Sequence, residues 1–167
     1  PLSRRDDHAK ACAKTGVAPD PAPYFAARAQ GLRLYCTPDR GFREGRLGHS
    51  YAGVCPEPAA GRFLPAYADG QLVHAAAARL SQARSDRESA DRRAEKRDRE
   101  ARGVEDELRN PVLNDEQKRE LRDRLNRLRS ERRAAIEDGR RADWATRDAE
   151  REVSNLEYQF RPIYGGW

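Results

Sequence analysis

The feature that most constrains this chain is a heptad spacing of apolar residues along its second half. From Gln71 to about Glu157, small or apolar residues recur at alternating steps of three and four, and Asn110-Pro111 interrupts the pattern once. Such spacing places them on one narrow stripe of an α-helix. Because the interruption is short, each stripe has the other as its nearest partner. The sequence therefore predicts a long antiparallel coiled-coil helical hairpin over residues 71–157, with its turn near residues 110–114.

The register of this hairpin follows from folding the two arms about residues 112–114. Pro111 ends the first arm, and Asn114 with Gln117 predicts a capping box that starts the second. We call the contact between the two stripes the seam. Each arginine in the seam then faces a leucine or a small residue. We therefore expect its aliphatic stem to lie along the seam while its charged end reaches water. Isolated helices and pairing with another chain are the alternatives. The predicted seam pairs are Val104 with Leu121, Ala101 with Leu125, Arg97 with Leu128, Ala94 with Arg132, Ala90 with Ala135, Arg87 with Gly139, Ala83 with Ala142, Leu80 with Thr146, Ala76 with Ala149 and Val73 with Val153.

Apolar residues also gather at the two ends of the hairpin. Val112 and Leu113 at the turn are either staples of the turn, which we favour, or a docking point. Residues 158–167 form an aromatic tail, which we expect to pack back on the small domain against the helices of Tyr24 and Phe63. A tail that binds a partner is the alternative. The residues of the tail that carry this expectation are Tyr158, Phe160, Ile163, Tyr164 and Trp167.

Residues 1–70 differ in character, because they hold all three cysteines and most of the prolines and glycines. Turn-forming residues break this half into short helices, with Asp20 as a cap for the second. We predict a small, all-α, Cys/Gly-rich domain whose last helix continues into the first arm of the hairpin. The helices expected in it are residues 8–14, 22–34, 41–48 and from 63 onward, with residues 51–58 as a loop.

The cysteines Cys12, Cys36 and Cys55 all lie in this small half. Small domains bury little apolar surface and often depend on disulfides, which form in oxidising compartments. Cys36 and Cys55 are the preferred pair, because they flank a Gly-rich loop that a bridge would restrain. Three is an odd number, so one cysteine is either free or paired with a residue before Pro1.

Charge is abundant but finely mixed along the chain. Charged residues make up 37% of it and the net charge is +5. Disorder is one interpretation of such polarity, but the heptad period disfavours it. Alternating positive and negative residues are typical of a solvent-exposed helix stabilised by ion pairs. We therefore expect no nucleic-acid partner. No apolar run approaches the length of about 18 residues that a membrane-spanning helix needs.

Catalytic and metal-binding patterns are missing from the sequence. His8, His49 and His74 are far apart, and the cysteines lack zinc spacing. Neither a Gly-rich phosphate loop nor a nucleophile elbow occurs. His8 precedes Cys12 by one turn, but both fit an ordinary amphipathic helix. We therefore expect no enzyme, no metal and no cofactor.

One set of residues in the first half carries a family resemblance. It consists of His8-x-x-Ala11-Cys12, Gly16, Tyr24, Gly31-Leu32-x-x-Tyr35-Cys36, Gly41-Phe42-x-x-Gly45-x-x-Gly48 and Tyr51-x-Gly53-Val54-Cys55-Pro56. Over roughly residues 4–75 the chain resembles a family of bacterial lipoproteins that carries only the label of a domain of unknown function. Ala27 stands where such proteins commonly have glycine. The resemblance implies a periplasmic, outer-membrane-anchored lipoprotein with a lipid anchor and one more cysteine before Pro1. That cysteine would pair with Cys12.

The functional expectation combines the resemblance with the hairpin. We expect a non-enzymatic structural or interaction protein of the envelope, a subunit of or adaptor to a larger assembly of other envelope proteins. The hairpin would serve as its spacer or docking arm. The alternative is a binding module for anionic polymers, namely lipopolysaccharide, peptidoglycan or nucleic acid, through the Arg-rich hairpin.

Overall fold

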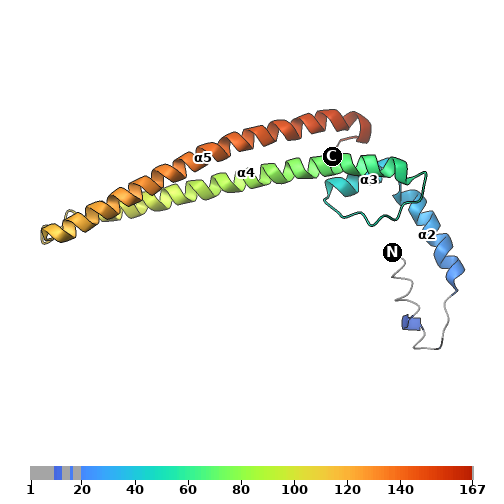
Figure 1. Cartoon of the computed structure of the whole chain (residues 1–167), viewed down its shortest axis with the longest axis horizontal. Helices are drawn as coiled ribbons and strands as arrows, with labels where there is room; N and C mark the ends of the chain where they lie inside the picture. Colours follow the sequence, from blue (N-terminus) through green and yellow to red (C-terminus); the bar gives the residue numbers. More distant parts are fainter. Residues whose placement is uncertain (1–9, 13–15, 17–19, 167) are drawn as a thin grey trace. The chain divides into compact units, whose positions relative to one another are not determined.

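The computed structural model describes residues 10–12, 16 and 20–166 (Figure 1). Within these residues it contains helices and no strand, which confirms the all-α class. The helices are α2 (Pro21–Tyr35), α3 (Pro38–Arg46), α4 (Ala60–Glu107) and α5 (Asp115–Tyr164). The helix predicted at residues 8–14 lies largely outside the described residues, although 10–12 are helical. Two compact units result: the small unit, Pro1–Ala75 with Asn155–Trp167, and the shaft, Ala76–Ser154.

Helices α2 and α3 begin at side-chain caps. Asp20 accepts a hydrogen bond from the Ala22 amide at 2.9 Å, as expected from the sequence. Thr37 caps α3 by accepting from the Arg40 amide at 3.3 Å, and Pro38 occupies its first turn. A Thr cap followed by Pro is a strong start signal. For this reason α3 begins three residues before the expected Gly41.

Close backbone contact joins α3 to α4 inside the small unit. A Cβ added at Gly41 would lie 2.5 Å from the Phe63 carbonyl oxygen, and one added at Gly45 would overlap the Tyr67 carbonyl oxygen. On the other side, a Cβ at Gly70 would overlap the Phe42 carbonyl oxygen. Only glycines allow two helices to come this close.

A compact apolar cluster lies next to this contact. Phe42, Ala66, Val73 and Phe160 are buried, and Leu156 and Tyr164 pack against them. The partner of the tail is thus α3, through Phe42, together with α4. The expectation that the tail packs against the helix of Tyr24 is wrong, because α2 has no buried residue.

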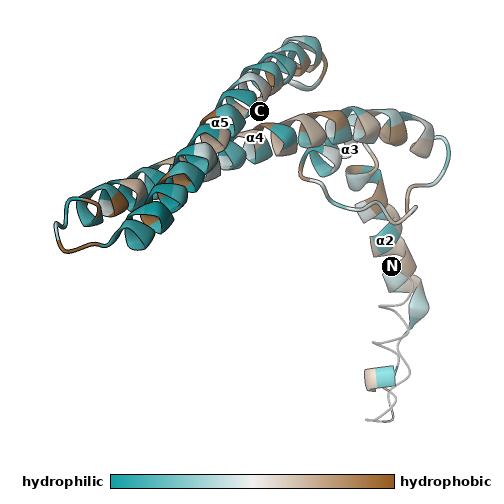
Figure 2. Cartoon of the chain, turned by 60° about the vertical axis from the view of Figure 1, so that its left-hand side comes forward, coloured by the Kyte–Doolittle hydropathy of each residue, from teal (hydrophilic) through white to brown (hydrophobic). Residues whose placement is uncertain are grey.

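The shaft is built from the middle of α4 and most of α5, which run alongside each other (Figure 1). Its buried residues fall on the predicted heptad stripes of both helices. They are Ala76, Ala83, Ala90, Ala101, Val104, Leu125, Leu128, Ala135, Ala142, Thr146 and Ala149. Charged residues cover the remaining surface, so hydrophilic colours dominate this part in Figure 2.

The largest apolar side chains of the shaft lie near its turn. Ala101, Val104, Leu125 and Leu128 form one buried cluster, with Leu108 and Leu121 packed against it. α5 begins in the predicted capping box. The Gln117 amide donates to the Asn114 side chain at 2.8 Å, and the Asn114 amide donates to the Gln117 side chain at 3.0 Å.

Ion pairs between α4 and α5 join early residues of one helix to late residues of the other. They are Arg79–Glu152, Arg84–Glu150, Arg87–Asp143, Arg93–Asp138, Arg97–Glu131, Arg132–Asp98 and Arg129–Glu105. The register differs in one detail from the predicted one. Gly139 was paired with Arg87, but a Cβ added there would lie 3.6 Å from the Cβ of Ala90. Seam residues of facing helices interdigitate, so each lies between two positions of the partner helix.

Candidate interaction surfaces

The predicted disulfide between Cys36 and Cys55 is present. Their Cα atoms are 5.6 Å apart, and the bridge closes a segment with a sequence separation of 19 residues. Cys36 is buried, and the Cys55 amide donates to the Tyr51 hydroxyl at 2.8 Å. The bridge therefore ties the loop after α3 to the C-terminal end of α2. Cys12 lies in the short helical stretch of residues 10–12, and its pairing with an upstream cysteine stays a prediction.

At the turn of the shaft, Val112 is 86% exposed and Leu113 is half-buried. Val112 is therefore not a staple, contrary to the favoured interpretation. Its amide donates to the Asn110 side chain at 3.1 Å, so a polar contact helps to hold the turn at this residue. Val112 and Leu113 as a docking point stay a prediction.

The tail divides into buried and exposed residues. Phe160 is buried, and the ring of Tyr164 stacks on Phe42 with centroids 4.2 Å apart. Tyr158 and Ile163 are 86% and 61% exposed, and Trp167 lies outside the described residues. Because α5 continues as a helix to Tyr164, only residues one turn apart on one face reach the core. Treating the tail as one aromatic group was therefore wrong.

Tyr164 also makes a polar contact within the small unit. Its hydroxyl donates to the Asp69 carboxylate at 2.8 Å. Burial and then this hydrogen bond raise the pKa of Tyr164 from 10.0 to about 12. The pair anchors the end of α5 to α4 with a neutral donor and a charged acceptor.

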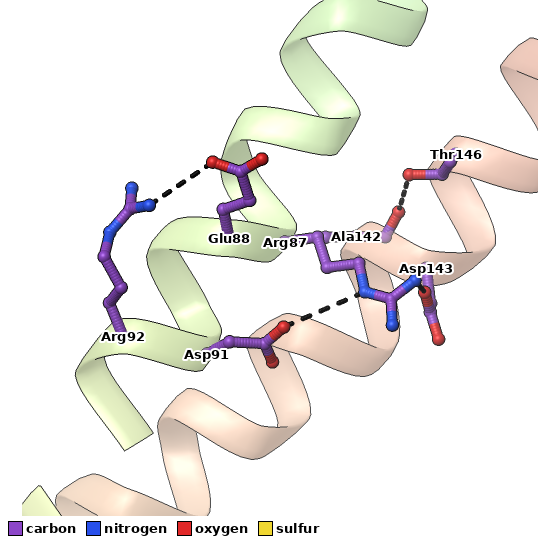
Figure 3. A network of polar contacts seen from close by, with 7 residues as sticks. All are labelled: Arg87, Glu88, Asp91, Arg92, Ala142, Asp143 and Thr146. Carbon is purple, nitrogen blue, oxygen red and sulfur yellow. Dashed lines mark hydrogen bonds and ion pairs between the residues drawn. The ribbon is translucent and has the colours of Figure 1, made fainter. Parts of the chain in front are cut away.

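Polar contacts in the middle of the shaft show how its arginines are placed (Figure 3). The guanidinium of Arg87 crosses from α4 to Asp143 of α5 at 2.7 Å and lies 3.9 Å from Asp91. Arg92 instead binds Glu88 of its own helix at 3.3 Å, away from α5. The expectation that seam arginines extend to water is therefore incomplete, since the ends of Arg87, Arg97 and Arg132 each meet a carboxylate of the facing helix.

Two carboxyl groups near the turn have altered titration. A hydrogen bond from Arg102 and the nearby Arg132 lower the pKa of Asp98. A hydrogen bond from Arg97 likewise lowers the pKa of Glu100. Both side chains are partly solvent-exposed and both hydrogen bonds lie within α4, so these pairs contribute little to stability.

The exposed surface of α5 carries a row of arginines, one of which, Arg129, reaches across to Glu105 of α4. We call this row the α5 outer face; its members are Arg119, Arg122, Asn126, Arg129, Arg133, Glu137, Arg140, Trp144, Arg147 and Arg151. All ten side chains are exposed. Glu137, the acidic member of the row, binds Arg140 at 2.8 Å, and the exposed Asp148 beside the row binds Arg151 at 3.0 Å. The face is therefore cationic at the four arginines that have no carboxylate partner within the described part of the chain, although the sequence along the helix alternates in sign.

Trp144 is the large apolar residue of this face. Its side chain is 67% exposed, and the guanidinium of Arg147 lies 4.7 Å from the ring centroid. Trp144 was not predicted from the sequence, because the charged residues were compared in chain order and not by the helical face on which they lie. Steps of three and four from Trp144 reach Arg140, Arg147 and Arg151, and that spacing is the signal that could have identified the face.

His49 and His74 serve local packing and hydrogen bonding. His49 contacts Glu44 at 2.9 Å, and the ring of His74 lies directly against Gly48. No group of three His, Cys, Asp or Glu that could hold a metal occurs among the described residues. In the same part of the chain, every helix is too short or too polar to cross a membrane.

The described elements define a class of all-α proteins that combine a disulfide with long paired helices. Comparison with protein families is more specific: the model of the family described as "Protein of unknown function (DUF2799)" matches residues 1–72. The predicted resemblance to a domain of unknown function is confirmed over this part of the chain. The comparisons with curated proteins and with solved structures each found no significant match.

Proposed function

We propose that this chain is a non-enzymatic structural or interaction protein whose α4–α5 pair forms an antiparallel coiled-coil hairpin that acts as a spacer or docking arm. One observation carries this proposal. Small residues are buried along both helices of the shaft, so each helix covers the seam of the other. Because the seam is buried within the chain, the outer faces of the two helices are the surfaces that can contact another molecule.

We further propose that the protein works outside the cytoplasm, as a lipoprotein of the periplasmic face of the outer membrane with other envelope proteins as partners. The Cys36–Cys55 bridge supports an oxidising compartment. The resemblance of the small unit to bacterial lipoproteins supports the anchor and the envelope partners.

Docking to protein is favoured over binding of an anionic polymer by the ion pairing of the shaft. Many of its arginines already bind a carboxylate within the chain, as Arg84, Arg93 and Arg97 do. Paired arginines contribute little to the diffuse positive field that attracts polymers such as nucleic acid or lipopolysaccharide.

The hairpin is tested with cysteines at Ala90 and Gly139, in a Cys12→Ser background. The separation of 3.6 Å between their Cβ positions suits a disulfide. We expect oxidation to give a cross-link within one chain, seen as a faster-migrating monomer on a non-reducing gel. Cysteines at Ala90 and the exposed Ser130 form the matched control and should not cross-link. Covalent dimers from the Ala90/Gly139 variant would contradict the hairpin and favour pairing between chains.

The compartment is tested by the thiol state of protein taken from cells. Without reductant, Cys36 and Cys55 should resist alkylation, and after reduction both should react. Complete alkylation before reduction would contradict the extracytoplasmic proposal.

The kind of partner is tested by affinity purification from solubilised membranes, followed by mass spectrometry. We expect defined proteins that are lost when the extract is first treated with protease. Retention of a polysaccharide or nucleic acid by protease-treated extract would support the polymer alternative.

A further inference from the structure

We infer that the α5 outer face is the docking face of the shaft and that it takes an acidic α-helix of a partner protein. This inference rests on the proposed docking function and names the surface and the partner chemistry. The three observations that carry it are the charge of the face, its exposed tryptophan and its length.

The charge of the face is only partly compensated inside the chain, because Arg129, Arg140 and Arg151 are paired with Glu105, Glu137 and Asp148. Among the described residues, no ion pair joins Arg119, Arg122 or Arg133 to a carboxylate within 4.0 Å. Arg147 lies over Trp144 instead of over an acid. Four of the seven arginines of the face are thus left without a carboxylate within 4.0 Å among the described residues. A partner with carboxylates along its length would neutralise it.

Trp144 adds an apolar anchor at which a partner can gain specificity. An aromatic ring of this size buries about 150–250 Å² when covered. Trp and Arg are the residue types that dominate binding energy at protein interfaces. Apart from Trp144, Val112 at the turn is the large hydrophobic residue that is well exposed within the described shaft. Trp144 is therefore the natural centre of an interface on α5.

The length and spacing of the face fit another helix. From Arg119 to Arg151 the face extends about 48 Å at 1.5 Å per residue. Its ten members recur at steps of three and four, with arginines three, four or seven residues apart, so carboxylates at matching steps on a facing helix can meet the arginines in turn. The guanidinium group is a planar fork that matches a carboxylate with two hydrogen bonds. An acidic helix also offers aliphatic side chains that can cover Trp144.

The experiment uses the full chain and fluorescently labelled probes, with binding followed by anisotropy. The main probe is a helical peptide with glutamates at steps of three and four on one face and with leucine beside them. The comparison probes are a peptide of the same composition in scrambled order, an oligothymidine and heparin. Circular dichroism confirms that each protein variant is folded.

The variants separate the face from general charge. Arg133→Glu and Trp144→Ala change the face, whereas Arg127→Glu makes the same charge change at an exposed site elsewhere on α5. We expect the helical peptide to bind more tightly than the scrambled one. Arg133→Glu and Trp144→Ala should each weaken binding at least tenfold, and Arg127→Glu should change it less than twofold.

Three outcomes would overturn the inference. One is an equal loss from Arg127→Glu and Arg133→Glu, which would indicate diffuse attraction. Another is tight binding of oligothymidine or heparin through Arg133 and Trp144 without binding of the acidic helix, which would indicate a polymer site. The third is no binding of any probe. None of these changes the Ala90–Gly139 cross-link, so a failure here is distinguishable from a failure of the proposed hairpin.

Discussion

At the scale of single residues, glycines determine how closely α3 can approach α4. Gly45 has the Tyr67 carbonyl and, at 2.9 Å, the Gln71 amide nitrogen at the position that a Cβ would occupy. Both neighbours are backbone, which cannot rotate away as a side chain can. By contrast, Gly103 lies in the exposed part of α4 with nothing within 4 Å of an added Cβ.

These two glycines give opposite predictions for substitution by alanine. Gly45→Ala should lower the free energy of unfolding by about 2–3 kcal/mol, because the helices must separate to admit the methyl group. Gly103→Ala should raise it by up to about 1 kcal/mol through helix propensity. Urea denaturation of both variants tests this. Equal effects of the two substitutions would show that α3 and α4 are not in backbone contact.

The Tyr164 hydroxyl predicts a dependence of stability on pH. Its pKa is raised to about 12 in the folded chain, so the folded state holds the proton more tightly than the unfolded state does. The stabilisation is complete below about pH 10 and is lost as pH rises from 10 toward 12. Between pH 9 and 12, the wild-type chain should lose more stability than Tyr164→Phe. Parallel loss in both proteins, measured by thermal denaturation, would contradict this role.

At the scale of helices, the start of α5 depends on the capping box of Asn114 and Gln117. Each side chain accepts from the backbone amide of the other residue, which satisfies two donors that the helix leaves unpaired. Asn114→Ala should therefore lower the free energy of unfolding by about 1 kcal/mol. Asn126→Ala, at an exposed site inside the same helix, is the control and should cause no loss. Thermal denaturation of both variants decides the matter, and equal stability would count against the cap.

The sequence predicted helices best where local signals were strong. The heptad period identified the buried stripes of α4 and α5, and Asn114 marked the start of α5. The start of α3 was missed, because the Thr37-Pro38 signal was not used. Contacts between distant residues were less predictable. The cross-helix carboxylates such as Asp143 depend on the exact register, which a seam of small residues only loosely specifies.

The candidate site was predicted in part. The Cys36–Cys55 pair followed from the Gly-rich loop between the cysteines. The prediction that the tail packs on the small domain was confirmed for Phe160, which is buried, but not for Tyr158, which helical geometry leaves exposed. Trp144 was missed, since a single tryptophan among charges shows no period of its own until its neighbours are placed on a helix.

At the scale of the whole molecule, the start of α4 and the end of α5 contribute side chains to one apolar core. Phe160, near the end of α5, contacts Phe42 of α3 with ring centroids 5.8 Å apart and belongs to the buried cluster with Ala66 and Val73. The small unit is therefore incomplete without Phe160, which comes 87 or more positions after the other members of the cluster.

This arrangement predicts that removal of the buried Phe160 side chain destabilises the small unit. Phe160→Ala should lower the free energy of unfolding by about 3–5 kcal/mol, as is usual for a buried aromatic residue. Tyr158→Ala, at an exposed position two residues earlier, should change it by less than about 0.5 kcal/mol. Chemical denaturation measures both. If Phe160→Ala leaves stability intact and abolishes only association with other proteins, the tail is a docking peptide instead.

The alanine seam of the shaft has a calorimetric consequence. The heat capacity of unfolding follows the apolar area that becomes exposed, and alanine side chains expose far less of it than leucines do. Scanning calorimetry of the full chain should therefore give less than the usual value of about 12–15 cal/mol/K per residue; a value at or above that range would contradict the prediction. A small heat capacity flattens the curve of stability against temperature. A shaft of this kind would keep nearly the same free energy of unfolding in cold and in warm surroundings.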